Sequence, residues 1–150
     1  MDKLIIDRKR WARGKPADGR GVNYLLSHDG SLCCLGFCMA QMGVPAEALL
    51  AEGCPNEVVS NHPGQFYRVR DVLVHKHDRD DAQYAGQEFT DSLTADSAID
   101  ANDDDSVTDE VREQEVSDIF KRHGIAVTFV DTPEETEALC GMPVDFGVRP

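Results

Sequence analysis

The stretch from Ser31 to Gly43 is the most apolar part of the chain and constrains the fold more than any other segment. It holds three of the five cysteines among leucine, phenylalanine and methionine, and a Gly-Val-Pro sequence typical of a helix end follows. A helix that is apolar around most of its circumference must be buried on most sides. We therefore expect this helix at the centre of the core, covered by the other elements.

Periodicity and breaker residues predict those other elements. An N-terminal amphipathic helix is expected because Leu4, Ile5, Arg8 and Trp11 follow helical spacing. The predicted helices cover 2–14, 31–43, 46–51, 87–94 and 106–123, and the predicted strands cover 22–26, 66–75, 97–99 and 125–130. Residues 56–60 fit a strand or a helical turn equally well, and 78–86 is predicted to be a surface loop.

These elements predict an α+β fold, with helices packed on a small mixed β-sheet. One compact domain is expected over residues 1–150, in which 132–150 could form a flexible tail. The predicted core comprises Trp11, Tyr24, Leu26, Cys34, Leu35, Phe37, Cys38, Val111, Ile119, Phe120, Val127 and Phe129.

Charge is distributed very unevenly. Residues 1–76 carry ten basic and eight acidic side chains, whereas residues 77–150 carry five and twenty, and the whole chain has a net charge of −13. The acidic half should repel phosphate backbones, so nucleic acid is an unlikely partner there and would have to use the basic N-terminal segment. An acidic surface suits a basic protein partner, or simply keeps the protein soluble.

The chain offers no sequence signal for a membrane or for export. No apolar stretch approaches the roughly 20 residues that span a bilayer, and the apolar run at Leu4–Ile6 is too short for a signal peptide. An odd number of cysteines, two of them adjacent, argues against a disulfide framework. We therefore expect a cytoplasmic protein with reduced thiols.

Cys34 is the candidate nucleophile. Its Cys-Leu-Gly-Phe sequence resembles the Cys-Ser-Gly-Phe start of the catalytic helix in papain-like cell-wall peptidases, although Leu35 replaces a small polar residue. A helix N-terminus lowers the pKa of a thiol, and the resemblance implies a histidine partner, which His75 or His77 could supply. Because cysteine is also commonly buried as a small apolar residue, the sequence favours structural thiols over a cysteine hydrolase.

Metal binding is a further alternative. Cys34 and Cys38 lie four residues apart on one helix face, and Cys54 and His62 could complete a set of ligands. That spacing matches no common zinc knuckle or ribbon, which use C-x2-C pairs. The Asp-rich run at 100–105 lacks the glycine that a calcium loop needs at position six, and we expect its acids to cap the following helix. No metal or other cofactor is therefore expected.

Several sequence words together resemble a family of small uncharacterised proteins from bacteriophages and bacteria. The motifs that carry this resemblance are IIDRKRWARG, CCLG at Cys33–Gly36, Asn102-Asp103, Arg112-Glu113 and GIAVTF. The family has no established activity, so the resemblance implies an accessory protein, in the host cytoplasm if phage-encoded, and no catalytic residue.

The leading hypothesis is a non-catalytic accessory protein that binds a host protein through an acidic or aromatic surface. The alternatives are the cysteine hydrolase and a small-ligand binding module. Arg8, Arg20 and Arg68 are the candidate ligand-binding residues of that module.

Overall fold

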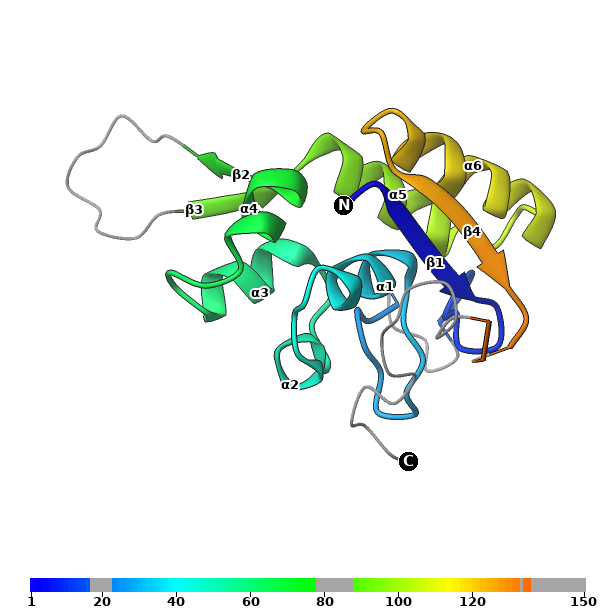
Figure 1. The fold of residues 1–150 in the computed structure, drawn as a ribbon, viewed down its shortest axis with the longest axis horizontal. Coiled ribbons are helices and arrows are strands. Elements are labelled where there is room, and N and C mark those ends of the chain that lie inside the picture. Colours follow the sequence, from blue (N-terminus) through cyan, green and yellow to red (C-terminus); the bar gives the residue numbers. More distant parts are fainter. Residues whose placement is uncertain (17–22, 78–87, 133, 136–150) are drawn as a thin grey trace.

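The structure is a computed structural model, and it describes residues 1–16, 23–77, 88–132 and 134–135. Figure 1 shows the arrangement of its elements. The helices are α1 Cys34–Gln41, α2 Ala46–Leu49, α3 Pro55–Asn61, α4 Tyr67–Leu73, α5 Leu93–Asp103 and α6 Asp109–Lys121, and the strands are β1 Lys3–Asp7, β2 Val74–His77, β3 Glu88–Asp91 and β4 Ala126–Val130. The predicted loop at 78–86 and most of the predicted tail at 132–150 lie outside the described residues.

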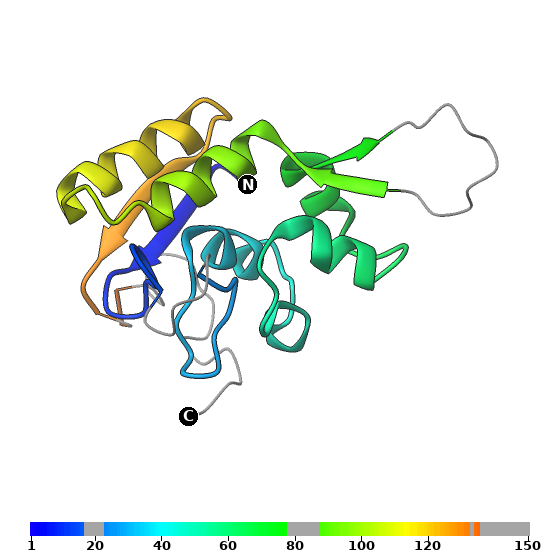
Figure 2. The same cartoon turned by 180° about the vertical axis from the view of Figure 1, so that it is seen from behind.

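The α+β class is confirmed. The described strands form two separate two-stranded sheets, in which β1 pairs parallel with β4 and β2 pairs antiparallel with β3. Helices α5 and α6 cover one face of the β1–β4 sheet, and the β2–β3 hairpin projects from one end of the molecule (Figures 1 and 2). None of the described helices is long and apolar enough to cross a membrane.

Helix α1 lies in the core as predicted. Its residues from Cys34 to Ala40 are all buried, and they pack beside β1 and α5. The side chain of Gln41 pairs with the outer edge of β1: its Oε1 accepts from the Ile5 N–H at 3.0 Å, and its Nε2 donates to the Ile5 carbonyl at 2.7 Å. The edge of this buried strand is therefore closed by one amide side chain.

The predicted N-terminal helix is wrong. Residues Lys3–Asp7 form β1, and Leu4, Ile5 and Ile6 are all fully buried. A strand buried on both faces is a continuous apolar run rather than an alternating one, and β-branched isoleucines favour it. The parallel partner of this run, β4, is itself a confirmed prediction.

The middle of the chain also differs from the prediction. Residues 67–73 are helical rather than extended, because Val69 and Leu73 lie one turn apart and both are buried. Residues 88–91 form a strand, and 97–99 lie within the single helix α5. The described part of 22–26 is irregular, with one isolated bridge between Leu26 and Leu50.

The predicted core is confirmed in most positions. Val111 is the exception, since it is 45% exposed while Arg112 takes the inward-facing position on α6. Tyr24 is only partly buried, and Val127 and Phe129 are partly buried against the core. The cap of α6 is Thr108, whose hydroxyl accepts from the Val111 N–H, rather than an aspartate of the 100–105 run.

Candidate functional site

Cys34, the candidate nucleophile, is the first residue of α1 and is fully buried. Its Sγ lies 3.6 Å from the carbonyl oxygen of Ala98 on α5 and can donate to it. Burial raises the pKa of Cys34 well above its ordinary value and raises the pKa of Cys33 to about 12. Because only the thiolate is a good nucleophile, this environment suits packing rather than catalysis.

The candidate histidine partners lie on a different part of the fold. His75 and His77 belong to β2, where they pair with Thr90 and Glu88 of β3. Both views show this hairpin extending away from α1 (Figures 1 and 2). A cysteine–histidine pair must lie within hydrogen-bond reach, and the fold does not bring these residues to Cys34.

We therefore expect the thiols of Cys33, Cys34 and Cys38 to be inert in the native protein. Iodoacetamide at neutral pH should modify each of them at least about a hundredfold more slowly than a free cysteine peptide, because raised pKa values leave little thiolate. Mass spectrometry of digested protein measures each site separately, and the same protein in urea serves as the control. If native Cys34 reacts faster than the peptide, the hydrolase alternative is favoured instead.

The same burial predicts an alkaline limit to stability. The pKa of Cys33 and Cys38 is about 12 in the folded protein, against an ordinary value of 9.0. Below pH 9 the thiols are protonated in both states and do not change stability with pH. As pH rises from 9 towards 12, only the unfolded chain loses these protons, so stability falls.

The four candidate metal ligands are not brought together. Cys38 is buried with its Sγ 3.7 Å from the Met1 Sδ, whereas Cys54 donates to the Asn56 Oδ1 at 2.7 Å. His62 lies at the other end of α3, packed edge-on against Phe66. Across the described ranges, no group of three or more His, Cys, Asp or Glu residues could hold a metal ion.

Of the candidate ligand-binding arginines, Arg8 is engaged within the chain. Its Nε lies 2.6 Å from Glu113 Oε1, its Nη1 lies 3.1 Å from Asp131 Oδ1, and its guanidinium stacks over Phe129. Arg68 is exposed on α4, and Arg20 lies outside the described residues. Among the described residues, Arg8 and Arg68 therefore do not form a common ligand site.

Two arginines of the basic N-terminal segment, Arg8 and Arg13, form ion pairs with acids of α6. Besides Arg8, Arg13 forms an ion pair with Asp109 at 2.9 Å, and its guanidinium lies over the Trp11 ring. Buried Arg112 also binds Asp109 and donates to the carbonyl oxygen of Asp104. Because Arg8 and Arg13 are paired within the chain, they are less available to phosphate groups than the sequence suggests.

Asn102 is an organising residue that the sequence analysis did not identify as such. It is buried, and its Oδ1 accepts from Trp11 Nε1 at 2.7 Å and from the Cys34 N–H at 3.0 Å. Its Nδ2 donates to the carbonyl oxygen of Ala12 and to the carboxylate of Asp103. Trp11, the CCLG motif and the Asn-Asp motif therefore meet in one buried network. In the sequence, the only indication of this network was that the three motifs occur together in one chain.

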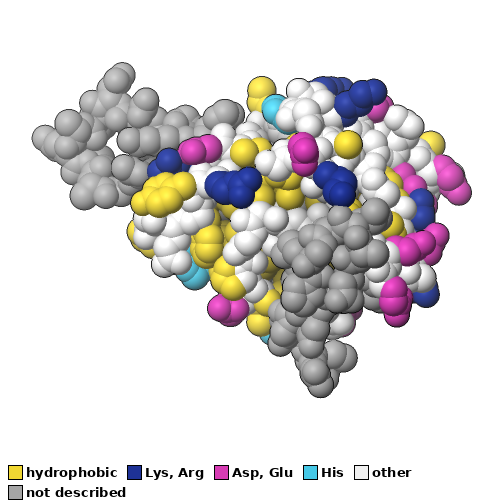
Figure 3. Space-filling model, in the orientation of Figure 1, with side chains coloured by type: hydrophobic (Ala, Val, Ile, Leu, Met, Phe, Trp, Pro, Cys, Tyr) yellow, Lys and Arg dark blue, Asp and Glu magenta, His cyan; other side chains and the backbone are white. Residues whose placement is uncertain are grey.

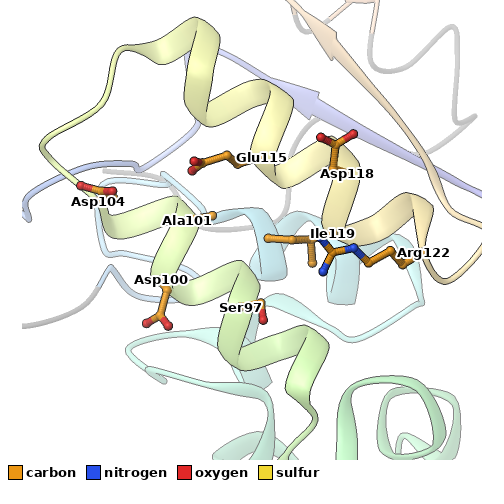
Figure 4. A pocket seen from close by; sticks show the side chains of 8 residues that line it. All are labelled: Ser97, Asp100, Ala101, Asp104, Glu115, Asp118, Ile119 and Arg122. Atoms are coloured by element: carbon orange, nitrogen blue, oxygen red, sulfur yellow. The ribbon is translucent and has the colours of Figure 1, made fainter.

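The candidate functional site is an open groove between α5 and α6, with a volume of about 380 Å³ (Figure 4). Its floor is the apolar pair Ala101 and Ile119, which are almost fully buried. The remaining lining residues are polar or charged: Ser97, Asp100, Asp104, Glu115, Asp118 and Arg122. The groove therefore combines an apolar floor with four carboxylates and one guanidinium.

The surroundings of the groove are also acidic. Residues 93–121, which form the α5–α6 hairpin, contain ten acidic and two basic side chains. Asp104 accepts from the N–H and hydroxyl of Ser106, which lowers the pKa of its carboxyl and keeps it ionised. In Figure 3, acidic side chains gather at the end of the molecule where α6 and β4 lie. The hairpin is thus a strongly negative surface with a defined hollow.

Comparisons with protein-family models, with curated proteins and with solved structures found no match. The sequence analysis noted the acids of this region as helix caps and as a surface that suits a basic partner or keeps the protein soluble, but it did not identify the groove. It missed the groove because it divided α5 into separate segments.

Proposed function

We propose that this protein is a non-catalytic binding protein whose α5–α6 groove holds a basic segment of a partner protein. The observation that carries the proposal is the lining of the groove, where carboxylates from both helices border the apolar floor of Ala101 and Ile119, although the Asp118 side chain points outward. Lysine and arginine side chains have the matching character, because a long apolar stem ends in a cationic head. The stem can cover the floor while the head meets the carboxylates in charge-assisted hydrogen bonds.

The charge of the whole hairpin supports the same partner. Ten acidic against two basic side chains over 93–121 attract a basic surface over several ångströms and raise its association rate. The same field opposes nucleic acid on this face. Under this proposal the thiols and Asn102 serve the stability of the scaffold.

The resemblance to phage and bacterial accessory proteins extends the proposal. If the protein is phage-encoded, its partner is a host protein that carries lysine or arginine on an accessible segment, and binding takes place in the host cytoplasm. The proposal requires neither a cofactor nor a membrane.

The proposal predicts which acidic residues matter for binding. A lysine- and arginine-rich peptide should bind the wild-type protein, and the double substitution D100N/E115Q should weaken it by about tenfold or more, because two groove carboxylates are lost. The double substitution D96N/E110Q removes the same charge from exposed positions on α5 and α6 that do not line the groove. Calorimetry should find this control close to the wild type.

A change in salt concentration provides a second check. Affinity should fall as ionic strength rises, since screening weakens exposed charge pairs. A peptide in which glutamine replaces each basic residue should not bind. Equal losses in the two double variants would show general charge attraction without a groove, and the proposal would then be wrong.

A further inference from the structure

The charges in the groove are not uniform along its length. Two contacts fix how α5 and α6 lie against one another: Arg112 donates to the carbonyl oxygen of Asp104, and Thr94 contacts His123. Asp104 and Glu115 therefore lie towards the connected end of the hairpin, and Ser97 and Arg122 lie towards its open end. The groove has an acidic end and a basic end.

Arg122 is available to a ligand. It is exposed at the C-cap of α6 and forms no ion pair within the described part of the chain. Figure 4 shows its side chain extending along the groove over Ile119, whereas the Asp118 side chain points out of it. Asp118 instead accepts from Gln114 Nε2 at 2.9 Å. A guanidinium with no ion-pair partner among the described residues thus faces a hollow whose other charged lining residues are all acidic.

A purely cationic ligand would leave this guanidinium opposed by like charge. Such a ligand gains at Asp104 and Glu115 but meets repulsion at Arg122, so it binds less tightly than a ligand that carries an anion at that end. A ligand with a cation at one end and an anion at the other satisfies both ends. The arrangement of charges in the groove therefore favours a ligand that carries an anionic group as well as a basic one.

We propose that the groove binds the carboxy-terminal lysine or arginine residue of the partner, an inference that rests on the function proposed above. The basic side chain lies at Asp104 and Glu115, its stem covers Ala101 beside the Arg122 side chain, and the terminal carboxylate accepts from Arg122. Ser97 provides a hydroxyl donor at the same end. A guanidinium–carboxylate pair is a strong, directional contact of the kind that captures chain termini.

The dimensions of the groove fit one residue. Seven residues separate Ser97 from Asp104 and Glu115 from Arg122, so the backbone positions at the two ends lie about 10 Å apart along either helix, and the Arg122 side chain shortens the span between the charges by extending over Ile119. From its carboxylate carbon to its guanidinium, an extended arginine spans about 7 Å at ordinary bond lengths. Hydrogen bonds add about 3 Å at each end. One terminal residue can therefore reach both charged ends of the groove.

The test compares two forms of one peptide that ends in Lys-Arg, one with a free carboxylate and one with a terminal amide. Calorimetry on the wild-type full chain should find the free acid bound about tenfold more tightly, as expected for one charge-assisted contact. In R122Q the two forms should bind alike. In K121Q, which removes the same charge from an exposed position outside the groove, the tenfold difference should persist.

The outcomes separate this inference from the proposed function. If the acid and the amide bind the wild type equally, the inference is wrong while the binding of basic segments stands. If neither form binds, the proposed function fails and the inference fails with it. If free L-arginine binds as tightly as the peptide, the occupant is a small molecule rather than the end of a chain, which also overturns the inference.

Discussion

Replacing Gly36 with alanine is expected to destabilise the protein by more than about 3 kcal/mol, the largest effect that we predict for one substitution. A Cβ at this position would lie 1.8 Å from the carbonyl oxygen of Leu25. The obstacle is backbone, and the Leu25 N–H is itself bonded to the Glu52 carbonyl at 2.8 Å, so neither side can move cheaply. Urea unfolding followed by circular dichroism measures the loss.

Gly43→Ala provides the matched control. Gly43 has φ of +94° but no heavy atom within 4 Å of a Cβ, so alanine there meets backbone strain without a clash. We expect a cost of about 1 kcal/mol for it. If G36A lowers the free energy of unfolding by no more than G43A does, α1 does not approach the Leu25 backbone as closely as the structure indicates.

Replacing Asn102 with alanine is expected to cost about 3 kcal/mol, because it leaves buried polar groups without partners. The Trp11 indole N–H and the Cys34 N–H would both lose their acceptor, and the Ala12 carbonyl would lose its donor. Urea unfolding should show the loss, and the indole N–H resonance of Trp11 should shift in the NMR spectrum of the folded fraction.

Asn61→Ala is the comparison for this substitution. Asn61 is exposed on α3 and makes one exposed bond, to Glu52 Oε1 at 3.0 Å. Its loss should cost less than about 0.5 kcal/mol. Similar values for N61A and N102A would contradict the role assigned to the buried network.

Helices α1 and α6 could be predicted because their own residues carry the signals of a helix. Helix α1 is apolar on nearly every side and ends before a Gly-Val-Pro sequence, and α6 has acids in its first turn and lysine in its last. The local sequence around Leu4–Ile6 does not distinguish a strand from a helix. Leu4–Ile6 becomes a strand only because β4, more than a hundred residues later, pairs with it.

The site was less predictable than the fold, for a similar reason. Val69 and Leu73 lie four residues apart, which places them on one face of a strand as well as of a helix, so the sequence analysis missed α4. The Asn102 network joins residues 91 and 68 positions apart, and no local pattern marks such a pairing. The α5–α6 groove depends on how two helices lie against one another. The sequence therefore showed that the region is acidic but not that its acids line a groove.

The most direct test of the central claim is NMR mapping of the full chain during titration with a lysine- and arginine-rich peptide. The claim predicts saturable shifts of the backbone amides that line the groove, at Ser97, Ala101, Glu115, Ile119 and Arg122, with little change along Tyr67–Leu73 of α4. Shifts that spread over the acidic surface without saturating, or that concentrate on another face, would contradict it.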